Sequence, residues 1–330
     1  MNWLELYGQA LDSGESAAGY YNRNVGVRTA EGKVNIRIPL AAADSMDVRL
    51  WDEEDVLACI GPYVGHTPEL RHVSRDPRFQ VHHFIEGQVL DSFSPRGSAV
   101  PSHVIDDVIG VMDQLARIPV EKAPLLPAEW PDSGDSAGFG RLLTRLTQRV
   151  YDTHRDEYAG VFAEFGIPAE PVAVVEPLWD GLESRPFAVL HADLHRKNMI
   201  VADGLTWFLD WELALWGDPM YEIGIHFHKM DYPAEQQAEA LRQWRARLPA
   251  QATVGPAADL ELYVAHERIK SAIVDTVRYS KQLVGADRSV REFLTGRLAR
   301  KLNVARAVWG ADTGMTAERV ARGLAAWVDR

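Results

Sequence analysis

The sequence contains one cysteine, Cys59, among its 330 residues. Because a disulfide needs two cysteines, this count excludes an internal disulfide framework, and Cys59, on an apolar helical face, is expected to be an inert core thiol. The sequence also lacks an apolar run of about 18 residues, the length that a membrane-spanning helix requires. The first five residues lack the basic and apolar regions of a signal peptide, so we expect a soluble, cytoplasmic protein.

Basic residues are too few for a typical nucleic-acid-binding protein. The chain has 35 Lys and Arg against 47 Asp and Glu, a net charge of −12 at pH 7. Nucleic-acid binding requires clustered Lys and Arg that neutralise phosphates, so we expect no nucleic-acid partner. The acidic balance is compatible with a cationic small-molecule partner. With 46% hydrophobic residues, the chain suits two domains or one domain of two lobes.

Two short segments carry most of the functional information. Residues 191–198 read His-Ala-Asp-Leu-His-Arg-Lys-Asn, and residues 209–212 read Leu-Asp-Trp-Glu. Asp193 and Asn198 have the separation found in the kinase catalytic loop H-R-D-L-x-x-x-N, and Asp210 stands where the D-F-G aspartate of kinases would stand. The spacing therefore predicts a phosphotransferase.

Phosphoryl transfer explains why these residue types are needed. Mg²⁺ takes oxygen ligands and usually only one or two of them from carboxylates, so one acid and one amide, Asp210 and Asn198, are a suitable protein contribution. Asp193 would accept a hydrogen bond from the acceptor hydroxyl and take its proton late in the transfer. Apolar runs at 187–190 and 207–209 favour β-strands, which would place both acids at strand ends beside a cleft.

Two other readings of the first segment stay open. His191, Asp193 and His195 also form an H-x-D-x-H pattern, which would suit the metal site of a zinc hydrolase. That reading gives no role to Asn198 or to the Leu-Asp-Trp-Glu segment. The other alternative is a nucleotide-binding module that has lost catalysis.

A third segment, Gly-Asp-Pro-Met-Tyr-Glu-Ile-Gly at 217–224, completes a resemblance to a known family. The three segments are similar to the H-G-D-x-H-x-x-N, I-D-W-E and G-D-P-x-x-D-L motifs of the aminoglycoside phosphotransferase and choline kinase superfamily. The resemblance implies an α+β, protein-kinase-like fold of two lobes that bind ATP and Mg²⁺. It places a small antiparallel β lobe at 1–86, a hinge near 82–87, and a larger, mainly helical catalytic and acceptor-binding lobe at 87–330.

The resemblance also assigns roles to single residues. His191 and Asp218 correspond to residues that brace the catalytic loop. Ala192 stands in place of the family's usual glycine. This departure is mild, because a methyl group there need not touch the phosphates. The catalytic base and the two magnesium ligands keep the roles derived above: Asp193, Asn198 and Asp210.

The N-terminal part is expected to form the nucleotide-binding lobe. Residues 20–39 read as a β-hairpin. The small, turn-prone run at 13–19 suits a loop that lies over phosphates, although it is not a G-x-G-x-x-G loop. In the family an apolar strand runs into the interlobe hinge, so the backbone near His83 and Ile85 is expected to contact adenine.

One arginine is expected to position the phosphates. Arg37, in Ile-Arg-Ile-Pro, stands where the kinase pattern V-A-I-K has its lysine, and family members often show V-R-I-P-G there. A planar guanidinium can contact phosphate. Glu53, in the acidic first turn of an expected helix at 52–60, would pair with Arg37 as the αC glutamate pairs with the lysine of kinases. Arg49 and Glu54 are the competing residues.

The acceptor pocket is expected among helices that carry no motif. Acidic residues there would attract a cationic acceptor, and Asp231, Glu267 and Asp275 are the candidates. Amphipathic patterns and their end signals predict helices at residues 101–118, 139–165, 234–248, 257–284, 289–309 and 316–328.

These observations predict an ATP-dependent O-phosphotransferase that acts on a hydroxyl of a small molecule, most plausibly an aminoglycoside or a related sugar-bearing antibiotic. The alternative is a metabolic kinase of choline, a sugar or an amino alcohol. Because the acceptor pocket has no motif, the sequence does not separate these two. A protein kinase is disfavoured by the lack of an A-P-E element and of a proper Gly-rich loop.

Overall fold

The structure is a computed structural model that describes residues 2–13, 17–18, 21–40, 46 and 48–328. Most of the run at 13–19, expected to lie over phosphates, falls outside the described residues. The chain divides into two compact units. Unit 1 comprises Met1–Leu126, Ala188–Trp216 and Lys229–Ala250, and unit 2 comprises Pro127–Phe187, Gly217–His228 and Gln251–Arg330.

A five-stranded antiparallel sheet forms the N-terminal part of unit 1, in the order β1-β2-β3-β5-β4. β2 and β3 form the predicted hairpin, in which Thr29 pairs with Gly32 across a two-residue turn. The Thr29 hydroxyl donates to the Gly32 carbonyl at 2.7 Å and closes this turn. The strands are β1 (Ala17–Ala18), β2 (Asn22–Thr29), β3 (Gly32–Pro39), β4 (Leu70–Arg75) and β5 (Arg78–His83).

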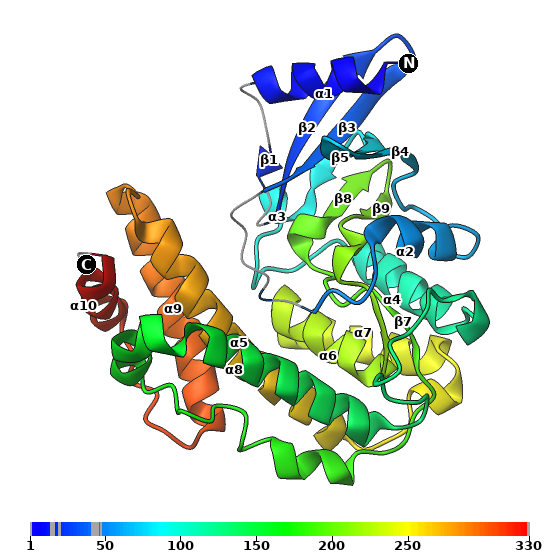
Figure 1. Cartoon of the computed structure of the whole chain (residues 1–330). Helices are drawn as coiled ribbons and strands as arrows, with labels where there is room; N and C mark the ends of the chain where they lie inside the picture. Colours follow the sequence, from blue (N-terminus) through cyan, green and yellow to red (C-terminus); the bar gives the residue numbers. More distant parts are fainter. Residues whose placement is uncertain (1, 14–16, 19–20, 41–45, 47, 329–330) are drawn as a thin grey trace. The chain divides into compact units, whose positions relative to one another are not determined.

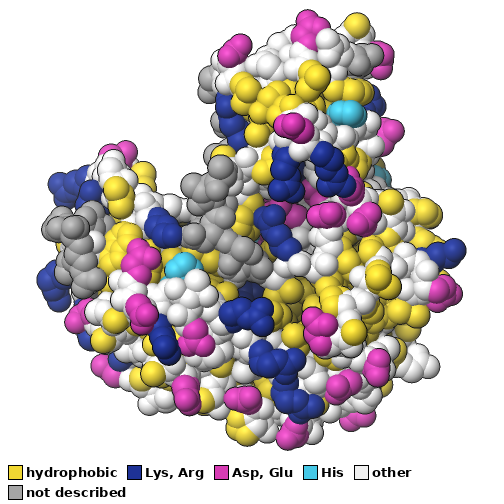
Figure 2. Space-filling view, in the orientation of Figure 1, with side chains coloured by type: hydrophobic (Ala, Val, Ile, Leu, Met, Phe, Trp, Pro, Cys, Tyr) yellow, Lys and Arg dark blue, Asp and Glu magenta, His cyan; other side chains and the backbone are white. Residues whose placement is uncertain are grey.

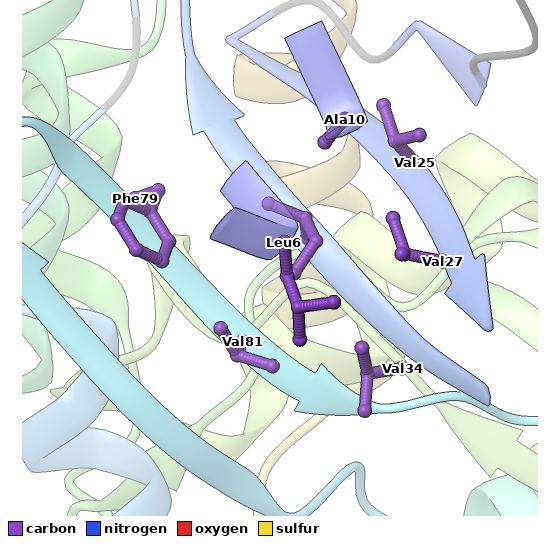
Figure 3. Close-up of a cluster of buried hydrophobic side chains, with 8 residues drawn as sticks. Leu6, Ala10, Val25, Val27, Val34, Phe79 and Val81 are labelled. Atoms are coloured by element: carbon purple, nitrogen blue, oxygen red, sulfur yellow. The ribbon is translucent and has the colours of Figure 1, made fainter. Parts of the chain in front are cut away.

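One helix, α1 (Trp3–Asp12), covers a face of this sheet (Figure 1). Alternate residues of a strand point to the same face, so the valines and isoleucine of β2 and β3 at every second position meet the apolar side of α1. Figure 3 shows the resulting cluster of buried side chains. Its members are Leu6, Ala10, Val25, Val27, Val34, Ile36, Phe79 and Val81.

A three-stranded sheet in the order β6-β8-β9 follows in unit 1. β8 and β9 form a hairpin with Ala202 opposite Leu205, and both turn residues, Asp203 and Gly204, have positive φ, as a two-residue hairpin turn requires. At the expected hinge, a Cβ on Gly87 would lie 2.6 Å from Ile200 Cγ2, so only glycine fits there. The strands are β6 (Gln88–Val89), β8 (Met199–Ala202) and β9 (Leu205–Phe208).

The remaining elements of unit 1 support these sheets. The predicted helix at 101–118 is present as α4, whose apolar face is buried and which packs on α7. β7 pairs with β10. The elements are α2 (Glu53–Ile60), α3 (Leu90–Phe93), α4 (Ser102–Ala116), β7 (Ala188–Leu190), β10 (Leu215–Gly217), α7 (Ala234–Arg247) and the short 3-10 turns Val120–Lys122, Arg196–Asn198, Trp211–Leu213 and Ala250–Ala252.

Unit 2 is built mainly from helices, and α5 and α8 lie side by side in it (Figure 1). α5 ends at Gly166, whose left-handed backbone forms the C-cap, as the sequence predicted. In the core, the Trp179 indole donates to the Thr144 hydroxyl at 2.8 Å, and the Tyr263 ring packs against the same indole at a tilt of 41°. The helices are α5 (Ser136–Phe165), α6 (Pro219–Met230), α8 (Ala257–Leu283), α9 (Arg288–Val308) and α10 (Ala317–Val328), with the 3-10 turn Glu176–Gly181. The last two residues of α6, Lys229 and Met230, belong to unit 1.

The predicted α+β class is confirmed, because antiparallel strands occupy the N-terminal part and helices most of the remainder. Basic side chains are interspersed with acidic ones on the face that Figure 2 shows. Among the described residues, none of the helices combines the length and the apolar character needed to cross a membrane.

Candidate active site

The segment 191–198 forms a loop between β7 and β8 in unit 1. The loop follows the fully buried strand β7, and the side chain of Leu194 in the loop is also buried. Arg196 anchors the loop, because its buried guanidinium donates to the carbonyls of Ser94 at 2.7 Å, Ser98 at 2.6 Å and Met230 at 3.2 Å. Each of the three guanidinium nitrogens thus has an acceptor, which fixes the loop against two other segments of unit 1.

Asp193 and Asn198 face each other across this loop. The Asn198 amide nitrogen donates to Asp193 Oδ2 at 2.8 Å and to the Asp193 carbonyl at 3.1 Å. Both partners can only accept a hydrogen bond, so the amide nitrogen must be on this side. The Asn198 side-chain oxygen is therefore the end that remains for a cation.

Asp210 is held next to the same loop. It follows β9, and the Leu209 N–H donates to the Asn198 carbonyl at 2.9 Å. His191 joins the two segments a second time, since its Nε2 lies 3.1 Å from the Leu209 carbonyl. A carbonyl only accepts, so Nε2 carries the proton, and burial lowers the pKa of His191 to about 4, which keeps the ring neutral.

Arg37 connects the N-terminal sheet to this segment. Its buried guanidinium forms an ion pair with Asp210, lies 3.0 Å from Glu212 and 3.5 Å from Glu53. The Trp211 N–H donates to Glu53 at 3.0 Å. Burial and the neighbouring carboxylates raise the pKa of Glu53, against the opposite effect of Arg37.

The two competing residues lie in other pairs. Arg49 is 3.2 Å from Glu212 and stacks over the Tyr21 ring, 4.2 Å from its centroid. Glu54 forms an ion pair with Arg75. Of the two sets that the sequence left open, Arg37 and Glu53 therefore pair with each other, and Arg37 also binds Asp210, whereas Arg49 reaches this cluster only through Glu212.

The expected hinge residues lie at the end of β5. His83 pairs with Val34 of β3, and its N–H donates to the Glu69 carbonyl at 2.8 Å. The His83 ring contacts Trp207 edge to face, with centroids 6.3 Å apart. Ile85 follows with a buried side chain.

The three acceptor candidates have different surroundings. Asp231 in unit 1 is exposed and lies 3.7 Å from Arg96. In unit 2, the buried Glu267 accepts from the Tyr221 hydroxyl and from Lys270, each at 3.0 Å. Asp275, also in unit 2, is ion-paired with Lys301. Within unit 2, Glu267 and Asp275 have different partners, and all three candidates have basic neighbours.

Asp218 lies in unit 2 and is fully buried. Arg185 binds it through two nitrogens at 2.8–3.0 Å, and the Tyr263 hydroxyl donates to it at 2.9 Å. The Met220 N–H also donates to Asp218 at 2.9 Å, which caps the start of α6. This network fixes the 217–224 segment within unit 2.

Two basic residues of the site were not predicted. Arg196 lies in the loop 191–198, but nothing in a single sequence distinguishes a buried arginine that holds a loop from an arginine on the surface. Lys229 forms an ion pair with Asp193 from the last turn of α6, a helix that sequence analysis did not predict. The available signal was a lone lysine at the end of an otherwise apolar stretch.

The sequence profile described as the phosphotransferase enzyme family matches residues 15–257. No sequence among the curated proteins matches the chain.

Several solved structures have a similar fold. A choline/ethanolamine kinase family protein from Mesorhizobium loti has a TM-score of 0.56 and 16% identity, over 98% of this chain and 99% of that one. Macrolide 2′-phosphotransferase from Brachybacterium faecium has a TM-score of 0.53 and 18% identity, over 90% and 92%. A thermostable mutant of an aminoglycoside phosphotransferase, in ternary complex with ADP and hygromycin B, has a TM-score of 0.51 and 15% identity, over 91% and 97%.

These likenesses confirm the predicted protein-kinase-like fold and the predicted resemblance. Because the family profile covers more than half of the sequence, the chain belongs to the phosphotransferase enzyme family.

Proposed function

We propose that this protein is an ATP-dependent O-phosphotransferase that moves the γ-phosphoryl group to a hydroxyl of a small molecule. The observation that carries the proposal is the contact of Asn198 with Asp193 at 2.8 Å, next to an Asp210 that Arg37 binds. A candidate base and two candidate metal ligands thus gather in one part of unit 1, as phosphoryl transfer requires.

In the proposed step, the acceptor oxygen forms a bond to the γ-phosphorus while the bond between that phosphorus and the β,γ-bridging oxygen breaks. The electron pair of the broken bond leaves with ADP, and the acceptor proton goes to the Asp193 carboxylate. Asp193 is mostly buried, and the net effect of its surroundings is to lower its pKa. Burial acts in the opposite direction, but Lys229 and His195 outweigh it, so the carboxylate is ionised and able to accept the hydroxyl.

The residues present suit a magnesium ion. The side-chain oxygen of Asn198 and the carboxylate of Asp210 are the hard oxygen donors that Mg²⁺ prefers. The surrounding cluster of Glu53, Glu212 and Asp210 with Arg37 and Arg49 has one more carboxylate than guanidinium, which favours an added cation. When bound, Mg²⁺ would neutralise charge on the ATP phosphates.

The nucleotide is proposed to bind where the N-terminal sheet meets the hinge. Arg37, held by Glu53, would contact the phosphates, and the backbone near His83 and Ile85 would contact adenine. Lobes at 1–86 and 87–330 are part of this proposal. The neighbouring aminoglycoside phosphotransferase structure contains ADP, which supports an adenine nucleotide.

His191 and Asp218 are proposed to hold the catalytic loop and the segment after it. The bond from His191 to the Leu209 carbonyl supports the first role, because it joins the loop to the residue before Asp210. The buried network around Asp218 supports a structural role for that carboxylate.

For the acceptor, we propose an aminoglycoside or a related sugar-bearing antibiotic. The likeness to a macrolide 2′-phosphotransferase and to an aminoglycoside phosphotransferase with bound hygromycin B supports this class. Asp231, Glu267 and Asp275 remain the proposed acceptor carboxylates, and cytoplasmic Mg·ATP would be the phosphoryl donor. The likeness to a choline/ethanolamine kinase family protein favours a second candidate, a kinase of an amino alcohol.

A coupled assay of ADP release tests the proposal. The purified protein is given Mg·ATP with hygromycin B, a macrolide, choline or ethanolamine in turn, and turnover with one antibiotic is the expected result. Turnover with an amino alcohol alone would favour the second candidate. Binding of Mg·ATP without release of ADP in the presence of any of these acceptors would reject the transferase in favour of a nucleotide-binding module. Stoichiometric zinc in the protein would favour the zinc hydrolase.

A further inference from the structure

Lys229 contacts the proposed catalytic base from outside the catalytic loop. Its ammonium forms an ion pair with Asp193 Oδ1 and lies 3.5 Å from the Ala192 carbonyl. Both side chains are largely shielded, with 23% of Lys229 and 14% of Asp193 exposed. A shielded ion pair in water-poor surroundings is stronger than a surface pair, because solvent screens it less.

The position of Lys229 is fixed by the surrounding structure. It lies in the last turn of α6, and a cation is favoured at the C-terminal end of a helix. The next residue, Met230, gives its carbonyl to the buried Arg196 of the catalytic loop at 3.2 Å. The chain that carries Lys229 is therefore attached to the loop that carries Asp193.

The two oxygens of Asp193 have different partners. Oδ2 accepts from Asn198 at 2.8 Å, whereas Oδ1 is bound by Lys229 and lies 3.5 Å from His195 Nε2. A carboxylate has about four lone-pair positions, so this arrangement leaves only a limited set of directions from which an acceptor hydroxyl can approach. The rotamer of Asp193 is set from both sides.

We propose that Lys229 is a positioning residue for Asp193, and that it orients the carboxylate toward the acceptor hydroxyl in the transfer proposed above. The inference rests on that proposed function. Its consequence for recognition is that Asp193 already has a cation, so a cationic acceptor must find its carboxylates elsewhere.

A double-mutant cycle tests whether Lys229 acts through Asp193. Lys229→Met keeps the length of the side chain and removes its charge, and it should lower kcat by about 10²-fold, the typical contribution of a well-placed proton acceptor. In an Asp193→Ala background, the same substitution should change kcat by less than about 3-fold, because the residue it positions is gone. Equal losses in both backgrounds would overturn the proposal.

The rates are measured as ADP release from Mg·ATP with hygromycin B, a macrolide, choline and ethanolamine. Binding of Mg·ATP by calorimetry should be unchanged in Lys229→Met, and loss of that binding would assign the lysine to the nucleotide instead. Lys122→Met, at an exposed lysine in the turn Val120–Lys122, is the matched control and should retain full activity. If the wild-type protein releases no ADP with any of the four acceptors, the proposed function itself is rejected. Normal turnover by Lys229→Met rejects only this inference.

A chemical rescue separates positioning from folding. Lys229→Cys is made in a Cys59→Ser background, which removes the other cysteine of the chain. The Cys thiolate displaces bromide from 2-bromoethylamine, and the new S–C bond restores a side chain of lysine length with an ammonium. At least a 10-fold gain in kcat after this treatment is expected, and no gain in a correctly folded protein would contradict the proposal. The Cys59→Ser protein with Lys229 intact receives the same treatment as the control.

Discussion

Two residues beside the proposed base adopt a backbone conformation that normally favours glycine. Ala192 has φ 57° and Asp210 has φ 66°. Aspartate tolerates the left-handed region better than alanine, because its short polar side chain can form local hydrogen bonds. The family pattern has glycine at the position of Ala192, and the positive φ gives the physical reason for it.

Replacing Ala192 by glycine should therefore stabilise the protein. Ala192→Gly removes the steric penalty of a Cβ at φ 57° and is expected to raise the free energy of unfolding by about 1 kcal/mol. Urea denaturation measures the change. Ala238→Gly, at an exposed position within α7, is the control and should lower the stability by about 1 kcal/mol, because glycine is a poor helix former. A less stable Ala192→Gly protein would show that the left-handed conformation carries no strain.

At the scale of single elements, the close packing around a glycine can be tested by substitution. At Gly87 a Cβ would meet Ile200 Cγ2 at 2.6 Å and the Val201 carbonyl at 2.7 Å, whereas at Gly8 of α1 it would meet nothing within 4 Å. Gly87→Ala should destabilise the protein by about 1–3 kcal/mol, because the backbone at residue 87 would be forced away from β8. Gly8→Ala should stabilise it by about 0.5–1 kcal/mol through better helix propensity. Thermal unfolding of the two variants gives the comparison, and a Gly87→Ala protein of unchanged stability would refute the tight packing at residue 87.

The elements that sequence analysis predicted are those whose signals are local. The hairpin of β2 and β3 has alternating apolar residues, and α4 and α8 have apolar faces with helical spacing and clear ends. α1 and α6 were missed, although α1 has an apolar face and an N-cap in Asn2. Both helices are short, and such helices gain most of their stability by packing on other elements.

In the candidate site, too, the residues that could be predicted are those with a local signal in the sequence. Asp193, Asn198 and Asp210 stand out because their spacing along the chain reflects the chemistry. Arg37 could be named only by analogy, since 173 positions separate it from Asp210. Lys229 could not be named at all, because its contact with Asp193 depends on how α6 ends beside the loop 191–198, which is a property of the folded structure.

At the scale of the whole molecule, buried histidines should make folding sensitive to mild acid. Burial lowers the pKa of His82 to about 3 and that of His191 to about 4, from an ordinary value of 6.5. At a pH between the folded and the ordinary pKa of these histidines, the unfolded chain binds more protons than the folded chain. The free energy of unfolding therefore falls as the pH drops below 6.5. The raised pKa values of Glu53 and Glu212 act in the opposite direction over part of this range, and the lowered pKa of His195 acts in the same direction as those of the other two histidines.

The free energy of unfolding is therefore expected to fall by about 2 kcal/mol between pH 7 and pH 5, the equivalent of one histidine shifted out of this range. His82→Leu removes one of these titrating rings and should make the profile flatter over the same interval. Denaturant titrations of both proteins at several pH values provide the measurement. An unchanged pH dependence in His82→Leu would show that this ring is not protonated on unfolding in the way described.

The kinetic behaviour of two aspartate variants tests the central claim most directly. Asp193→Ala should lower kcat by at least about 10²-fold while the affinity for Mg·ATP stays nearly unchanged, because the residue acts on the acceptor. Asp210→Asn should instead weaken the binding of Mg·ATP itself. A single experiment that measures kcat and the Kd of Mg·ATP for both variants gives the answer: this split is the predicted result, and an Asp193→Ala protein with a near-normal rate would contradict the account.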